Sequence, residues 1–341
     1  MKPSIGASVA AECRRLLGQT AKTCFDLFKI TVPISILVKI LSDAGAIGFL
    51  GSFLSPVMDL VGLPGSMGLV WAAGLMTNLY GALVVFASLA AEAALTVAQV
   101  TVLTTMLLIA HALPVELRIA QMAGPRFWTM ILLRLFSALM LGWMLNHIYR
   151  FGDFLQHPNR LLWQPAAPDP SWTAWIGGEL RTMAMIFAII LVLLVVMRVL
   201  EKARILDLFC RLLERPLIAL GMTGQAAPIT VIGMTLGLSY GGALIIQEAR
   251  SGRLGARDIF LSLALMGLCH SIVEDTFVMM LAGGHLSGLL AARLLFSLTV
   301  VFLLGKFFQR ISEESFRRYF FPSWDNLVPK GGRGKGARAE E

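Results

Sequence analysis

Charged residues are scarce in this chain. Asp, Glu, Lys and Arg make up 15% of its 341 residues, whereas hydrophobic residues make up 57%. The mean hydropathy of +0.74 means more apolar surface than a soluble domain can bury in its interior, which excludes a water-soluble globular protein. Because backbone polar groups in lipid must be satisfied within helices, we predict an all-α polytopic membrane protein.

Sequence motifs for disulfides, cofactors and catalysis are also missing. The four cysteines have no C-x-x-C spacing, which argues against a disulfide framework and a zinc knuckle. The chain contains no G-x-x-x-x-G-K-[ST] loop, no H-E-x-x-H motif and no Ser/His/Asp signature. No short apolar stretch with a cleavage site follows the basic N-terminus, so we read no removable signal peptide. We expect neither an enzyme nor a bound cofactor.

Basic residues outnumber acidic ones, which gives a formal net charge of +8. The basic residues lie mainly at the ends of apolar segments and in the C-terminal stretch KGGRGKGARAEE. Membrane topology and anionic lipid explain such a distribution. We therefore expect the lipid bilayer as a partner, and no nucleic acid.

The most informative positive feature is an internal repeat. HALPVELRIAQMAG at 111–124 and HSIVEDTFVMMLAG at 270–283 align without a gap, and Arg134 and Arg293 keep the same 159-residue offset. With small shifts, residues 26–149 match 182–308. We divide the chain into an N-terminal segment 1–25, a first repeat 26–149, an external loop 150–179, a second repeat 180–308 and a basic tail 309–341.

The two repeats show opposite charge patterns. The joint at 88–96 carries Glu92 and no basic residue, whereas the matching joint at 250–257 carries Arg250, Arg253 and Arg257. Since Lys and Arg in short loops favour the cytoplasm, the repeats are expected to have inverted topology. We expect a bacterial-type cytoplasmic (inner) membrane protein with both termini in the cytoplasm.

This orientation requires an odd number of crossings per repeat, although each repeat has four apolar blocks. The conflict disappears if 66–90 and 225–249, whose middles are polar and glycine-bearing, are re-entrant hairpins. The preceding stretches, 45–63 and 203–220, mix polar and apolar residues as interfacial helices do. Each repeat is thus predicted to contain a helix, an interfacial helix, a re-entrant hairpin, an interrupted helix and a helix.

This order of elements, together with VPISILVKIL at 32–41, VWAAGLMTNLYGAL at 70–83 and AHALPVELRIAQMAG at 110–124, resembles the Gate or nucleoside recognition family. That family includes the spore maturation proteins A and B, the core of the concentrative nucleoside transporters and the membrane part of bacterial ferrous-iron permeases. The resemblance implies that hairpin tips and interrupted helices carry the binding groups. The matching residues are Thr77, Asn78, Tyr80, His111, Glu116, Ser239, Tyr240, His270, Glu274 and Asp275.

Ionisable side chains at membrane depth need partners or water, so Glu116, Glu274 and Asp275 are the strongest functional candidates. Glu116 could instead pair with Arg134, and Asp275 with Arg293, as structural ion pairs. Glu274 has no acidic counterpart in the first repeat, where Val115 stands, and is the single residue that we favour most.

Histidine also occurs at equivalent positions of the two repeats. Such a pair could bind substrate, carry protons or ligate metal. In the second repeat, Cys269, His270 and Glu274 form an alternative metal-ligand set, with His270 and Glu274 at i,i+4 spacing on one helical face.

The sequence therefore favours a secondary transporter of a small polar solute, for which the resemblance implies a nucleoside-like compound and an elevator-type alternating-access mechanism. Two alternatives stay open: a divalent transition-metal permease and a non-transporting partner in a membrane assembly. A homo-oligomer is compatible with either.

Overall fold

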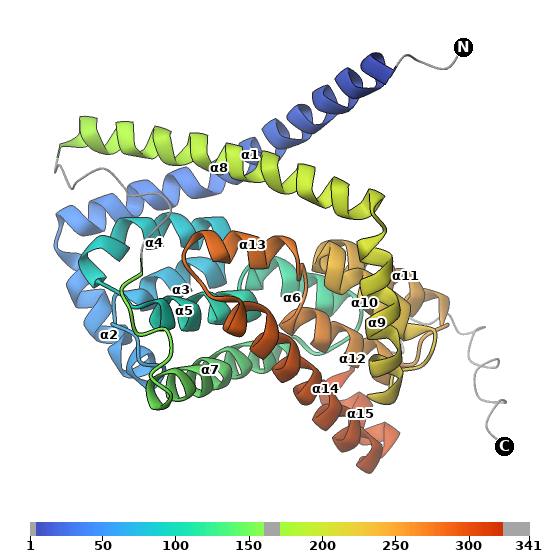
Figure 1. Cartoon of the computed structure of the whole chain (residues 1–341). Helices are drawn as coiled ribbons and strands as arrows, with labels where there is room; N and C mark the ends of the chain where they lie inside the picture. The colour runs from blue at the N-terminus through green and yellow to red at the C-terminus, as the bar shows by residue number, and fades with distance from the viewer. Residues whose placement is uncertain (1–4, 160–170, 323–341) are drawn as a thin grey trace, which may run out of the picture.

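The computed structural model describes residues 5–159 and 171–322 (Figure 1). Within these ranges the regular secondary structure is helical, apart from an isolated bridge between Thr96 and Pro158. The prediction of an all-α polytopic membrane protein is confirmed. The helical stretches long and apolar enough to cross a bilayer are Val97–Met122, Phe127–Phe151, Trp172–Leu200 and Ser287–Arg310.

The order of helices is the same in the two halves of the chain. The first half contains α1 (Ile5–Asp43), α2 (Ala46–Leu60), α3 (Met67–Met76), α4 (Leu79–Ala93), α5 (Val97–Ile109), α6 (Leu113–Met122) and α7 (Phe127–Phe151). The second contains α8 (Trp172–Lys202), α9 (Ile205–Ala219), α10 (Ala226–Leu236), α11 (Leu238–Ser251), α12 (Ala256–Leu268), α13 (Glu274–Leu281), the π-helical turn η1 (Ser287–Ala292), α14 (Arg293–Arg310) and α15 (Glu313–Phe320). The helices follow the predicted order in both halves, whereas the interfacial and re-entrant placements and the inverted orientation stay predictions.

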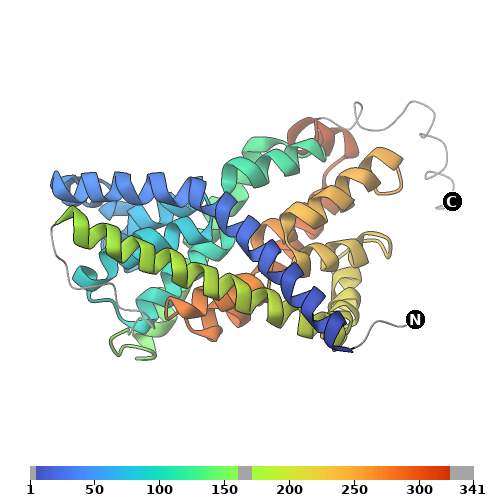
Figure 2. The same ribbon diagram turned by 90° about the horizontal axis from the view of Figure 1, so that it is seen from above.

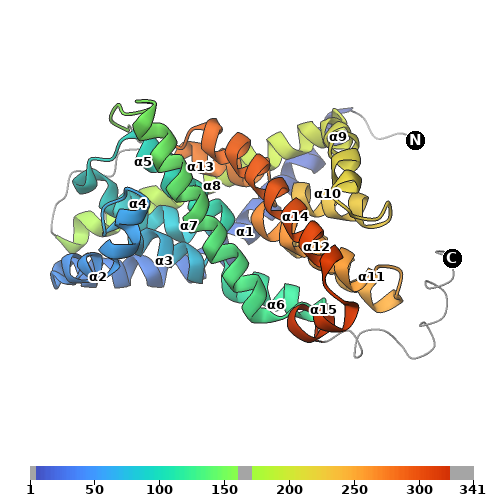
Figure 3. The same cartoon turned by 90° about the horizontal axis from the view of Figure 1, so that it is seen from below.

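The long first helices of the two halves, α1 and α8, contact each other and cover one face of the molecule (Figure 2). The long helices α7 and α14 lie on the opposite face (Figure 3). Helix α1 continues without a break across residue 25, so the predicted N-terminal segment and the first repeat share one helix.

The second helix of each half has the surface expected of an interfacial helix. Phe49 and Phe53 on α2 are 75% and 76% exposed, and Leu208 and Leu212 on α9 are 64% and 67% exposed. Large apolar side chains that are exposed along short helices are typical of contact with lipid.

Two helical hairpins occupy the stretches predicted to be re-entrant. In the first, Thr77 and Asn78 separate α3 from α4, and Asn78 caps α4 by accepting a 2.9 Å hydrogen bond from the Gly81 backbone N–H. In the second, Gly237 alone joins α10 to α11, with φ of 95°, a conformation that favours glycine.

The helices predicted to be interrupted are broken at equivalent positions. Ala112, between α5 and α6, has φ of 48°, and Ser271, between α12 and α13, has φ of 45°. Left-handed backbone at a non-glycine residue ends a helix and costs energy unless its surroundings hold it. Each break is held by a hairpin, because Ala112 N–H donates to Gly74 O at 2.9 Å and Ile272 N–H donates to Met234 O at 3.0 Å.

The second piece of each broken helix packs against helices of the other half of the molecule. The core around α10 to α12 includes Leu113 and Leu117 of α6, and the core around α3 to α5 includes Val278 and Met279 of α13. Helix α6 packs on α11, and α13 packs on α5. The two breaks therefore lie where the two halves interlock.

Close packing of the second hairpin gives a testable requirement for glycine. A Cβ on Gly241 would overlap the Gly233 Cα and the Met266 sulfur, whereas a Cβ on Gly177 of α8 would meet nothing within 4 Å. We predict that Gly241→Ala lowers the free energy of unfolding by about 1–3 kcal/mol, the usual range for overpacking. Thermal unfolding in detergent checks this, with Gly177→Ala as a control that leaves stability unchanged or raised. Equal effects of the two substitutions would contradict the close approach of α10 and α11.

Candidate substrate and ion site

The two breaks expose backbone carbonyls inside the molecule, and one arginine satisfies them in each half. Arg134 Nε donates to Ile109 O at 2.9 Å, and its Nη2 donates to His111 O at 3.1 Å. Arg293 Nε donates to Leu268 O at 3.1 Å, and its Nη2 donates to His270 O at 2.9 Å. Both arginines are 1% exposed. Their first role is therefore to supply the hydrogen bonds that the broken helices lack.

The histidines at the breaks have the same local geometry in both halves. His111 Nδ1 donates to Leu107 O at 2.8 Å, and His270 Nδ1 donates to Met266 O at 2.7 Å. A carbonyl oxygen only accepts hydrogen bonds, so Nδ1 carries the proton in each ring. In the neutral imidazoles, Nε2 is left with its lone pair.

These rings meet in a buried centre formed by both halves. The ring centroids of His111 and His270 are 5.0 Å apart. Glu116 Oε1 lies 3.4 Å from His111 Nε2 and 3.2 Å from His270 Nε2. Asp275 Oδ2 lies 4.0 Å from His111 Nε2. The structure thus brings together four of the ten residues predicted to bind substrate.

The two carboxylates of this centre have different partners. Glu116 Oε2 accepts a hydrogen bond from Arg134 Nη1, which forms a buried ion pair as predicted. The expected counterpart between Asp275 and Arg293 is not formed among the described residues, since Asp275 Oδ2 and Arg293 Nη1 are both buried without a hydrogen-bond partner. Arg293 uses its other donors on the break, which leaves the Asp275 carboxyl group without an arginine partner among the described residues.

Glu274, the residue favoured most from sequence, lies at the start of α13 with an exposed side chain. The predicted metal set of Cys269, His270 and Glu274 assumed one continuous helix. Because the chain is not helical between Leu268 and Glu274, the i,i+4 relation does not apply. Among the described residues, the group with metal-ligating atoms within 4.8 Å of one another is His111, His270 and Asp275.

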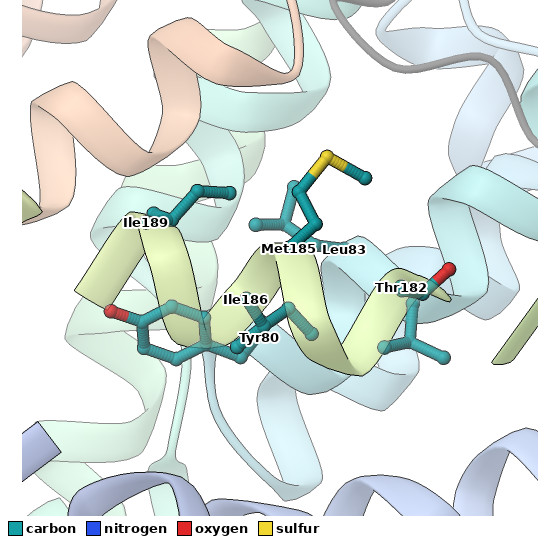
Figure 4. A pocket seen from close by; sticks show the side chains of 7 residues that line it. Tyr80, Leu83, Thr182, Met185, Ile186 and Ile189 are labelled. Atoms are coloured by element: carbon teal, nitrogen blue, oxygen red, sulfur yellow. The ribbon is translucent and has the colours of Figure 1, made fainter. Parts of the chain in front are cut away.

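The residues predicted at the hairpin tips serve other purposes or are not described. Thr77 Oγ1 donates to Ala73 O at 2.6 Å, so Thr77 and Asn78 form the turn itself. Tyr80 lies in a mostly apolar pocket between α4 and α8 (Figure 4). The side chains of Ser239 and Tyr240 lie outside the described part of the structure. The other residues lining the pocket are Leu83, Val84, Thr182, Met185, Ile186 and Ile189.

Sequence reasoning did not anticipate that His111 and His270 touch, nor that backbone groups of Gly74 and Met234 hold the breaks. The equal spacing of the repeats was the available signal for the first point. No sequence signal marks a backbone acceptor.

The unequal pairing of the carboxylates predicts unequal effects of equivalent substitutions. Glu116→Gln leaves the buried Arg134 charge uncompensated, which costs about 3 kcal/mol, at the lower end for a broken buried pair because Gln still accepts a hydrogen bond. Asp275→Asn removes a carboxylate that pairs with no arginine, and we expect a smaller loss. Thermal unfolding of both variants in detergent measures the difference. A loss in Asp275→Asn that equals or exceeds that in Glu116→Gln would argue against this assignment.

Comparison with known proteins finds similarity in the first repeat and over most of the chain. Residues 24–126 match the family model described as "Gate: Nucleoside recognition". A relative from Bacillus subtilis (strain 168), named "Uncharacterized membrane protein YvoD", is 28% identical over 261 residues, which are 75% of this chain and 82% of the relative. No solved structure matches the chain. Residues 24–126, which hold the first hairpin, His111 and Glu116, are therefore similar to the Gate nucleoside recognition family, and the chain is similar to a membrane protein of B. subtilis.

Proposed function

We propose that the protein is a secondary transporter of the bacterial inner membrane that binds a small polar solute at the centre formed by His111, Glu116, His270 and Asp275. The observation that carries the proposal is the meeting of equivalent residues from two interrupted helices in one buried site. Transporters built from inverted repeats bind their substrates at the repeat interface, on broken helices near the midplane.

The chemistry of the centre supports transport over a purely structural role. Ionisable residues inside a membrane are costly and mark substrate or ion pathways. Glu116 is explained by Arg134, but Asp275 keeps a buried oxygen without a partner. A structural centre gains nothing from an unsatisfied carboxylate, whereas a binding site gains a ligand.

The hairpins are connected to the breaks in a way that suits alternating access. Each break is hydrogen-bonded to the first helix of the hairpin in its own half, through Gly74 and Met234. Hairpin and break would therefore move together. This connection supports an elevator-type movement, in which the site is carried with the hairpins. In this proposal both termini lie in the cytoplasm.

Two solute classes have a specific observation behind them. The family description points to nucleoside-like solutes, and the ligand group at the centre points to a divalent metal ion. A non-transporting assembly partner is the contrasting function, in which the centre would serve folding alone.

Transport assays on two neighbouring acids test the proposal. In proteoliposomes offered a panel of nucleosides, nucleobases and divalent cations, we expect Asp275→Asn to abolish flux, because the unpaired oxygen is lost from the site. Glu274→Gln, changed in the same way one residue earlier, is expected to retain flux because its side chain lies outside the centre.

Flux lost in Glu274→Gln but kept in Asp275→Asn would move the pathway away from the histidines. No flux of any panel member through the intact protein would favour the assembly partner.

A further inference from the structure

The atoms that converge on the centre are all electron-pair donors. In their neutral form His111 and His270 present Nε2 lone pairs, because Nδ1 carries the hydrogen that is donated to a carbonyl. Glu116 contributes Oε1, since its Oε2 is taken by Arg134. Asp275 contributes Oδ2, which is buried and has no hydrogen-bond partner. Lone pairs facing one another in a buried site repel unless a proton or a metal cation lies between them, and a metal cation is the one that can engage several of them at once.

The spacing of these atoms fits a metal ion. Tetrahedral coordination with bonds of about 2.1 Å places ligand atoms about 3.4 Å apart. The separations here are 3.2 Å for His270 Nε2 to Glu116 Oε1, 3.4 Å for His111 Nε2 to Glu116 Oε1 and 4.0 Å for His111 Nε2 to Asp275 Oδ2. The three residues whose ligand atoms all lie within 4.8 Å of one another are His111, His270 and Asp275, and Glu116 adjoins both histidines.

The chemical type of the donor atoms indicates which metal ions fit the site. Two imidazole nitrogens favour Zn²⁺, Co²⁺ or Ni²⁺ over Mg²⁺ and Ca²⁺, which prefer oxygen. Each Nδ1 hydrogen bond to a carbonyl is the outer contact that orients a metal-ligating histidine. Arg134 orients Glu116 in the same manner.

The burial of the site also favours an ion over an organic solute in this conformation. The side chains of His111, His270 and Glu116 are 6%, 4% and 9% exposed. An ion needs only the space between its ligands, whereas a nucleoside would require the two broken helices to separate.

We propose that His111, His270 and Asp275, together with the neighbouring Glu116, form a binding site for a divalent transition-metal ion that bridges the two repeats. The inference rests on the proposed function to the extent that this ion is then the transported solute. Binding itself needs no transport and can be measured separately.

Metal binding to the purified full chain tests the proposal. After chelator treatment and dialysis in detergent, Co²⁺ and Zn²⁺ are titrated, with bound metal measured by elemental analysis and the Co²⁺ site by visible absorption. We expect one ion per chain and a Co²⁺ spectrum typical of low coordination number. His270→Ala and Asp275→Asn should each weaken binding by more than about tenfold, since ligands contribute at least as much as outer contacts.

His147→Ala is the matched control, because His147 makes the same Nδ1 contact, to Trp143 O at 2.8 Å, on the exposed side of α7. Its metal binding should equal that of the unchanged protein. Asp275→Asn removes no hydrogen bond of Oδ2 and keeps the test valid if His270→Ala fails to fold.

No stoichiometric binding by the folded protein, or binding unchanged in Asp275→Asn, would overturn the metal site. Stoichiometric binding without metal flux in proteoliposomes would support the site and count against the proposed transport. Nucleoside flux in a protein that binds no metal would support the proposed transport and overturn the metal site.

Discussion

The fold depends on satisfying the backbone where two membrane helices are broken. In a bilayer an unpaired carbonyl costs several kcal/mol, so a break survives only if side chains or neighbouring backbone supply the missing hydrogen bonds. Arg134 and Arg293 do so in the same way, each donating to two carbonyls of the break in its own half. Gly74 and Met234 accept the N–H groups on the other side. These contacts hold His111 and His270 at the point where the two halves meet.

The departure from symmetry is as informative as the symmetry. Both arginines use Nε and Nη2 in the same way, but only Arg134 uses Nη1 on a carboxylate. The first half therefore supplies an acid paired with an arginine, and the second supplies an acid without such a partner. Divergence at this contact leaves the arginine scaffold of both breaks in place and makes the two acids chemically distinct.

The sequence predicted much of this architecture, because a repeated pattern of apolar segments and a fixed 159-residue offset are visible without coordinates. It correctly paired Glu116 with Arg134 eighteen residues away. It wrongly placed His270 and Glu274 on one helical face, since i,i+4 reasoning presumes a helix, and the stretch between Leu268 and Glu274, which contains the left-handed Ser271, is not helical. Ala112 gives no warning of the equivalent break, because alanine favours helices. The contact of the two histidines depends on the exchange of α6 and α13 between cores, which is long-range packing that local patterns do not encode.

The exchange of α6 and α13 has a consequence for biosynthesis. Helix α6 leaves the ribosome well before α11, the helix against which it packs. Until then Leu113 and Leu117 lack their partners from the second half, and α6 packs only on helices of its own half, such as α7. The first repeat is therefore an incomplete unit in the membrane until the second repeat has been made. Both cores are completed together, because each contains residues of both repeats.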